Sequence, residues 1–399
     1  MTRTVLVCDD EPDLAFDLVK RIAEVAPKEI YDVQRAPTNE EIAEGIKELL
    51  RRRHAAREKV VRPADSCVFD GIDILVVDYD LLHVDEDNAR YTGEGVARLA
   101  RQFADCAIVV VLNQFPEAQF DLSLRGHLES HADLNLDVEL VGTDGLWRPR
   151  PWQGFRPWSW QVLGDAVDRQ RQRTETVARS LDSKIVEVLG MTAEDATRLS
   201  DSAFGFLAPS ARNFDALAEQ TFRMFVERTP DGRDAGALLE VNPNSAAGFA
   251  AARIAKWLER EVLGPQDVLV DIPHLLQRYP FLLAGDVKDV EAWNEAIEDK
   301  GALKQRLPAD VWFDKPGWLS RPAVWWRRLE TNAEIRKQRL EFDFSLVPDV
   351  VFLEDISLFM PLDQAHDFRS GFHNSFDRRF AKVVDGIRYA PQRRLAFGV

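Results

Sequence analysis

Acidic residues directly follow two apolar runs near the start of the chain. The sequence begins MTRTVLVCDDEP, so that Asp9, Asp10 and Glu11 end the first run, and Asp78 closes a second run in DILVVDYDLL. Carboxylates this close together repel one another and raise one another's pKa unless a cation lies among them. Carboxylate oxygens suit Mg²⁺, and an Asp beside Mg²⁺ can act as a nucleophile toward a phosphoryl group.

The elements that must position these acids alternate between β-rich runs and amphipathic runs. We expect strands at residues 4–8, 31–35, 72–77 and 107–112, and a weaker fifth strand at 139–141 that Leu146 and Trp147 extend. Helical spacing marks 12–25 and 95–103, and Thr38 or Asn39 suits the cap of a helix between the second and third strands. This alternation is typical of a parallel sheet covered on both faces, which predicts a doubly wound α/β domain over residues 1–150.

The order of the strands decides whether the acids meet. Ligands of parallel α/β sheets gather at the carboxyl ends of the strands, which is where Asp9, Asp10 and Asp78 stand. In the strand order 2-1-3-4-5 the first and third strands are neighbours, so the three carboxylates converge at one edge. Such a cluster predicts a hard cation, and we expect Mg²⁺ as the cofactor.

Taken together, these pieces resemble the receiver domains of two-component response regulators, which have a flavodoxin-like fold. The resemblance covers residues 1–150. It rests on the acid pair in VCDDEP, the acid after the third strand in VVDYDLL, and an Arg-Pro pair, Arg148 and Pro149, after the fifth strand. It implies that Asp78 is the phosphoacceptor and that a histidine kinase is the upstream partner.

The resemblance also implies a set of Mg²⁺ ligands. Asp10 would coordinate the ion directly, and Asp9 would do so through a water molecule. Asp78 and the backbone carbonyl of Asp80, two residues after the phosphoacceptor, would complete the protein's share of the shell.

Three positions depart from the family pattern. Asn113 stands where the family places Ser or Thr after the fourth strand, and Arg148 stands where it places Lys before Pro. Gly145 occupies the place of an aromatic residue that many receivers carry, and the intervals between the matching positions are longer than usual. Asn113 could still donate a hydrogen bond to a phosphoryl oxygen, and Arg148 keeps a cation with a different reach. The acids needed for phosphorylation are therefore kept, while the residues that report it have changed.

A Trp/Arg/Pro-rich linker and a connecting helix follow at residues 151–200. The stretch LWRPRPWQGFRPWSW, residues 146–160, either fills a seam between two domains or stacks on bases, and we favour the seam. Residues 159–189 have the spacing of a long helix. That helix is either a coiled coil that forms a homodimer or an amphipathic helix packed on its own domain.

Residues 201–399 are predicted to be an output domain of unknown type, either mixed α/β or mainly helical. A helix is expected at 245–263, strands at 268–272 and 350–353, and a hairpin at 383–397. Four tryptophans at 312–328 would build a core or a partner surface. A weaker alternative is a second carboxylate–metal site made by acids near apolar runs: Asp267, Asp271, Glu354 and Asp355.

The spacing of the histidine and cysteine residues does not predict a metal site or a disulfide. His127 and His131 lie four apart without a second ligand pair, and His366 and His373 are no better placed for a metal. The cysteines are odd in number and mostly inside apolar runs, which indicates reduced core residues: Cys8, Cys67 and Cys106.

Composition limits the partners. The 399-residue chain has a net charge of -16, which argues against coating nucleic acid or an anionic membrane. It has no apolar run of the ~18 residues that cross a bilayer and no signal-peptide pattern, so a cytoplasmic protein is expected. Nucleic-acid binding ranks last, through the basic residues Arg378, Arg379, Lys382, Arg388, Arg393 and Arg394.

The leading functional prediction is a response-regulator-like signalling protein. Phosphorylation of Asp78 with Mg²⁺ would control the C-terminal domain through protein–protein contact or dimerisation. Two alternatives remain open at this point. One is a receiver-gated hydrolase or nuclease in residues 201–399, and the other is a degenerate receiver that serves as a docking module.

Overall fold

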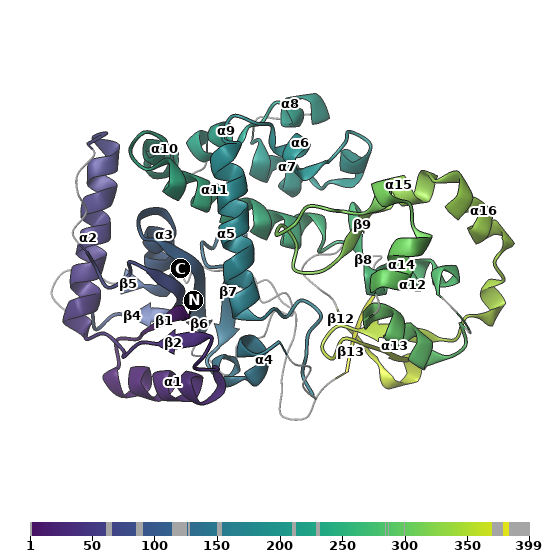
Figure 1. Cartoon of the computed structure of the whole chain (residues 1–399), viewed down its shortest axis with the longest axis horizontal. Helices are drawn as coiled ribbons and strands as arrows, with labels where there is room; N and C mark the ends of the chain where they lie inside the picture. Colours follow the sequence, from purple (N-terminus) through teal and green to yellow (C-terminus); the bar gives the residue numbers. More distant parts are fainter. Residues whose placement is uncertain are drawn as a thin grey trace.

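A computed structural model of the chain describes residues 2–60, 66–84, 91–113, 126, 128–149, 154–209, 213–228, 232–283, 285, 287–298, 300–368 and 378–382. An N-terminal parallel sheet and its helices occupy one side of the molecule, and strands β8–β13 with α12–α16 occupy the other (Figure 1). The helices α6–α11 lie between and above them, next to the long helix α5 (Figure 1).

Five parallel strands form the N-terminal sheet, in the order β2-β1-β3-β6-β7. Their bounds are β2 (Tyr31–Val33), β1 (Arg3–Cys8), β3 (Ile72–Val77), β6 (Cys106–Asn113) and β7 (Leu134–Asp137). The predicted parallel α/β sheet is confirmed, and the first and third strands are neighbours, as the 2-1-3-4-5 order requires.

The predicted position of the fifth strand is wrong. Residues 140–142 form a 3₁₀ turn and Leu146 and Trp147 belong to a short helix, α4 (Asp144–Trp147), while the strand lies at 134–137. The prediction followed the apolar run at 140–141. An edge strand instead alternates, and here Leu134 and Leu136 are buried while the residues between and after them are partly exposed.

Helices cover both faces of the sheet. Helices α1 (Pro12–Val25) and α5 (Leu163–Arg179) pack on one face, and α2 (Asn39–Arg57) and α3 (Gly93–Phe103) pack on the other. Because side chains alternate along a strand, each central strand contributes to both cores. Thr38 is the cap of α2: its hydroxyl accepts from the backbone N–H of Glu41, whose carboxylate accepts from the Thr38 N–H.

The connecting helix is shorter than predicted, and its apolar face is covered. Helix α5 ends at Arg179, and a separate helix, α6 (Ile185–Leu189), follows. Leu163, Val167 and Val177 are buried against the sheet and against helices of the same chain. The amphipathic-helix alternative therefore holds for α5, and a coiled coil through this face is wrong. A homodimer stays a prediction and would need another surface.

The second half continues the hydrophobic core of the first. Its helices are α7 (Asp201–Leu207), α8 (Phe214–Ala218), α9 (Phe222–Arg228), α10 (Gly232–Val241), α11 (Pro243–Trp257), α12 (Ile272–Arg278), α13 (Val290–Glu298), α14 (Lys300–Arg306), α15 (Trp326–Thr331) and α16 (Ala333–Glu341). Helix α11 continues into a π-helical turn at Leu258–Val262 and packs on α5 and α3. One buried cluster joins Leu75 and Val96 of the sheet lobe to Phe249 of α11. The domain limits at 150 and 200 stay predictions, since the packing runs across them.

The far side of the molecule mixes helices with short strands. Strands β8 (Leu269–Asp271) and β9 (Ala323–Trp325) pair, and a four-stranded sheet has the order β11-β10-β13-β12. Its bounds are β11 (Leu358–Pro361), β10 (Val350–Leu353), β13 (Arg379–Ala381) and β12 (His366–Phe368). Strands are therefore present at both predicted places, whereas the predicted hairpin at 383–397 lies outside the described residues. Three of the four tryptophans at 312–328 are buried in cores: Trp318, Trp325 and Trp326.

None of the helices in the described ranges is both long enough and apolar enough to cross a membrane.

A small hairpin joins β3 to α3 beside Asp78. It consists of β4 (Asp80–Leu81) and β5 (Tyr91–Thr92), and Thr92 caps α3 by accepting from the N–H of Gly95. Gly93, the first residue of α3, lies so close to the turn that a Cβ on it would be 2.2 Å from the carbonyl oxygen of Asp78. This position therefore requires glycine.

We expect Gly93→Ala to lower the free energy of unfolding by about 1–3 kcal/mol, because the added methyl group must displace the backbone at Asp78. Gly95→Ala is the matched control: its Cβ would meet only the Thr92 hydroxyl, at 3.4 Å, and alanine favours a helix by about 0.5–1 kcal/mol. Urea unfolding of both variants is the measurement. Equal stabilities would contradict this account of the turn.

Candidate metal centre

The register of β1 and β3 brings the acidic residues together. Cys8 pairs with Val77, so Asp9 and Asp78 are the next residues on two neighbouring strands. Oxygen atoms of Asp9, Asp10 and Asp78 all lie within 4.8 Å of one another. The three residues are only 3%, 5% and 1% exposed, respectively. The structure therefore places three carboxylates in one buried cluster, which we call the acidic site.

Backbone N–H groups orient each carboxylate. The N–H of Glu11 donates to Asp9 Oδ1 at 2.9 Å, and the N–H of Asp80 donates to Asp78 Oδ2 at 2.9 Å. The N–H of His83 donates to Asp10 Oδ2 at 2.7 Å. These donors fix the carboxylates and offset part of their charge, but none of them is a cation.

Asn39 holds two loops of the acidic site together. Its Nδ2 donates to the carbonyl oxygens of Asp10, at 3.0 Å, and of His83, at 3.3 Å. Sequence reasoning considered this residue only as a helix cap. Its supporting role depends on a contact across 44 positions, for which the sequence carries no local signal.

Burial and neighbouring charges both favour the protonated form of Asp9. Burial raises the pKa of Asp9 to about 6, and the neighbouring Asp10 and Glu11 charges add to the shift, while the Glu11 N–H opposes it. The oxygens of Mg²⁺ ligands lie about 3–4 Å apart across the ion, and those of Ca²⁺ ligands somewhat farther. The spacing, the burial and the all-oxygen donor set of the acidic site therefore fit a hard divalent cation.

The other predicted site residues divide into two groups. Asn113 is the last residue of β6 and pairs with Asp137, so its backbone lies at the same edge of the sheet as the acidic site. Asp80 directs its N–H to Asp78, and its own side chain is exposed.

Arg148 does not lie at the acidic site. Its Nε donates to the carbonyl oxygen of Val25 at 2.9 Å, at the C-terminal end of α1, whereas α1 begins beside Asp10. The 14 residues of α1 span about 20 Å, which places Arg148 at the opposite edge of the sheet. The prediction failed because it followed the misplaced fifth strand. For the same reason Gly145, which lies in α4, does not follow the fifth strand.

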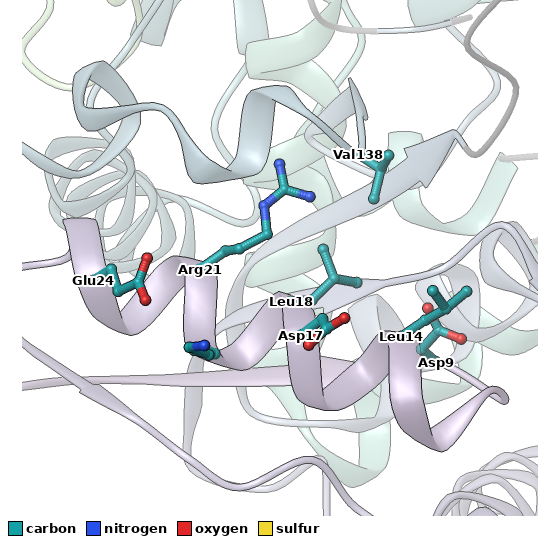
Figure 2. Close-up of a pocket in the computed structure, with 8 residues that line it drawn as sticks. Asp9, Leu14, Asp17, Leu18, Arg21, Glu24 and Val138 are labelled. Atoms are coloured by element: carbon teal, nitrogen blue, oxygen red, sulfur yellow. The ribbon is translucent and has the colours of Figure 1, made fainter.

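A groove runs from the acidic site along α1. Its volume is about 450 Å³, and it is lined by Asp9, Leu14, Asp17, Leu18, Lys20, Arg21, Glu24 and Val138. Figure 2 shows Asp9 near the start of α1, Arg21 and Glu24 farther along the helix, and Val138 opposite. Arg21 closes the far side by donating to the carbonyl oxygen of Glu139 at 3.3 Å. One end of the acidic site is therefore reached from an open surface.

The described part of the Trp-rich linker packs between the two sides of the molecule. Trp158 Nε1 donates to Asp271 Oδ2 at 3.1 Å, and its backbone N–H donates to the carbonyl oxygen of Glu354 at 3.0 Å. The Arg156 N–H donates to the carbonyl oxygen of Asp355 at 2.6 Å. Residues 154–160 thus join the sheet lobe to β8 and β10, as the seam interpretation predicts, while 150–153 lie outside the described residues.

Two acids of the weaker second metal alternative, Asp271 and Glu354, are already neutralised. His274 lies between Asp271 and Glu354 with one ring nitrogen against each carboxylate, and these carboxylates raise the pKa of His274 against the effect of burial. Arg321 contacts Asp271 at 2.8 Å, and Arg379 contacts Glu354. This cluster needs no metal ion. Among the described residues, only the acidic site has the grouping of ligands that a metal requires.

The described histidines and C-terminal basic residues that the sequence suggested for metal or nucleic-acid binding do not form such a site. The ring of His131 packs on Phe249 with centroids 5.8 Å apart, and His366 is exposed, while His127 and His373 lie outside the described residues. Of the basic C-terminal residues, Arg379 is turned into the cluster around Glu354 and Arg378 pairs with Asp367. Arg388, Arg393 and Arg394 also lie outside the described residues.

Comparison of the chain with protein-family models, with curated proteins and with solved structures gives no match.

We expect Asp9→Asn to be more stable than wild type by about 1–2 kcal/mol at pH 7 in EDTA, because it removes a buried charge that neighbouring carboxylates repel. The sign of the pH dependence follows from the raised pKa: the folded state binds a proton more tightly than the unfolded chain. The Asp9 contribution therefore stabilises the protein as the pH falls from 7 toward 5.

Urea unfolding at pH 5 and pH 7, with EDTA and with Mg²⁺, tests this expectation. With Mg²⁺ the order should reverse, since wild type binds the ion more tightly than the variant. A wild type that is more stable than Asp9→Asn in EDTA at pH 7 would show that repulsion does not dominate this site.

Proposed function

We propose that the chain is a response-regulator-like signalling protein whose N-terminal domain accepts a phosphoryl group on Asp78. The observation that carries the proposal is the buried cluster of three carboxylates at the ends of β1 and β3. The strand order β2-β1-β3-β6-β7, with helices on both faces, supports a flavodoxin-like, receiver-like fold for this domain.

The residues of the acidic site have separate roles in this proposal. Asp10 and Asp9, with Asp78 and the carbonyl of Asp80, would hold Mg²⁺, whose charge would offset the charge that develops on the phosphoryl oxygens. A carboxylate oxygen of Asp78 attacks the phosphorus of a phosphohistidine on the kinase. The new P–O bond forms an acyl phosphate as the P–N bond breaks, and the leaving imidazole keeps the electron pair and takes up a proton.

The route by which this chain would report phosphorylation differs from the family pattern. Arg148 lies about 20 Å away along α1, so it does not supply a cation to a phosphoryl group on Asp78. Asn113 is the remaining candidate donor from β6. This difference favours one second candidate function, a receiver-like domain that docks a partner without being phosphorylated.

The surface beside the acidic site suits a protein partner such as the kinase. Leu14 and Phe16 of α1 are 43% and 67% exposed, and Leu14 also lines the groove that reaches Asp9. Exposed apolar side chains next to a reactive group are typical of an interaction site. Control of the C-terminal half through protein contacts is part of the same proposal. The gated-enzyme alternative gains no support, because the acids around His274 are held by arginines.

Incubation of the full chain with acetyl phosphate and Mg²⁺, followed by intact mass measurement, tests the proposal. We expect one phosphoryl group on wild type and none on Asp78→Asn, which keeps the size but removes the nucleophilic carboxylate. Asp80→Asn is the matched control, since it changes an exposed acid nearby and keeps the backbone carbonyl, and it should be phosphorylated like wild type.

Two outcomes would decide against the assignment. Loss of the modification in Asp80→Asn with retention in Asp78→Asn would make Asp80 the acceptor. A wild type that binds Mg²⁺ but takes up no phosphoryl group would favour the docking module.

A further inference from the structure

A third buried charge cluster lies between α3 and α11, and the proposed chemistry does not use it. Glu94, the second residue of α3, is 8% exposed, and the Ser130 hydroxyl donates to its carboxylate oxygens, which lie 2.7 and 2.8 Å away. Asn135 Nδ2 donates to the same carboxylate at 3.2 Å. Burial raises the pKa of Glu94, and Lys256 is the largest influence that opposes this shift. Glu94 is thus held by groups near β7 and faces the charge of α11.

Helix α11 and the π-helical turn that continues it present three cations to the segment that precedes β7. Arg253 and Lys256 are three residues apart on one face of α11, and Arg260 follows in the π-helical turn. Arg253 and Lys256 donate to backbone carbonyls at 2.7–2.9 Å, and Arg260 makes the same kind of contact. The accepting carbonyls belong to Gly126, Leu128, Ser130 and Ala132. We call these three cations and four carbonyls the α11 clamp.

Partial opening of the α11 clamp costs free energy, because it separates buried cations from the carbonyls that accept their hydrogen bonds. Lys256 and Arg260 are only 6% and 5% exposed. Burial lowers the pKa of Lys256 well below its usual value, and the Glu94 carboxylate opposes that shift. A buried cation that loses its acceptors without reaching water costs several kcal/mol. The clamp is therefore expected to be either closed or fully open, as a switching element requires.

Contacts run without a gap from the α11 clamp to the acidic site. Ser130 is the junction, because its carbonyl accepts from Lys256 while its hydroxyl donates to Glu94. Glu94 follows Gly93, whose N–H donates to the carbonyl oxygen of Tyr79 at 2.8 Å. Gly93 also leaves no room for a side chain against the Asp78 carbonyl, so the first turn of α3 is fixed to the turn that carries Asp78.

We propose that the α11 clamp regulates the acidic site: through Ser130 and Glu94 it holds the first turn of α3, and thereby the Asp78 turn, in the geometry that binds the cation. This inference rests on the proposed function, since it assumes that the acidic site binds Mg²⁺. By linkage, Mg²⁺ at the acidic site stabilises the closed clamp, and any partner of the second half that displaces α11 weakens Mg²⁺ binding by the same factor.

Mg²⁺ titration of the full chain, followed by NMR or calorimetry, tests the inference in two clamp variants. Ser130→Ala removes the hydroxyl but keeps the accepting carbonyl, and Lys256→Met removes the charge at similar length. We expect each to bind Mg²⁺ about 5- to 20-fold more weakly than wild type, within the range of ordinary allosteric coupling. Ser357→Ala is the matched control, because its buried hydroxyl donates to the carbonyl oxygen of Arg156, away from α3, Ser130 and α11, and it should bind like wild type.

Hydrogen exchange of wild type gives a readout that needs no variant. Mg²⁺ should slow the exchange of amides in 128–134 and in the second half of α11, and this result decides the matter if Lys256→Met fails to fold. Mg²⁺ binding by wild type, with affinities of Ser130→Ala and Lys256→Met within twofold and no added protection, would overturn the inference and leave the proposed function standing. A wild type that does not bind Mg²⁺ would overturn both.

Discussion

Three carboxylates buried at the ends of two neighbouring strands are the constraint on which the rest of the N-terminal half depends. Burial raises the pKa of Asp9, and the charges of Asp10 and Glu11 add to the shift. Repulsion among the three carboxylates opposes the packing that brings β1 beside β3. The fold tolerates them because backbone N–H groups orient each carboxylate and because Asn39 holds the Asp10 and His83 loops together. A site built at such an energetic cost is most readily explained by a ligand that carries positive charge.

Charged side chains are also buried in the second half, but there other groups of the protein neutralise them or accept their hydrogen bonds. Around His274, the carboxylates of Asp271 and Glu354 meet Arg321 and Arg379, and the linker residue Trp158 completes the contact between the two sides of the molecule. Along α11, cations meet carbonyls and Glu94. The acidic site differs from both clusters in the groups that contact its carboxylates, which include the neutral backbone N–H groups of Glu11, Asp80 and His83.

The sequence was sufficient to predict the sheet and the acidic site. Strands β1, β3 and β6 consist mostly of apolar residues, and the acids after two of them need only the strand order to become neighbours. It was insufficient at the edge of the sheet, where the short alternating strand β7 was overlooked in favour of an apolar turn at 140–141, and Arg148 was misplaced with it. Asn39, Gly93 and Lys256 act through contacts with residues distant in sequence, or through space that a side chain would fill. A local sequence pattern does not predict contacts of this kind.

The central claim is that the acidic site binds one hard divalent cation. Electron paramagnetic resonance of added Mn²⁺, which takes oxygen ligands like Mg²⁺, measures this directly as the loss of the free-ion signal. The account predicts one bound Mn²⁺ per chain that Mg²⁺ displaces, retention of that site in Asp137→Asn at the same edge of the sheet, and its loss in Asp10→Ala. Equal Mn²⁺ binding by wild type and Asp10→Ala, or no binding by wild type, would contradict it.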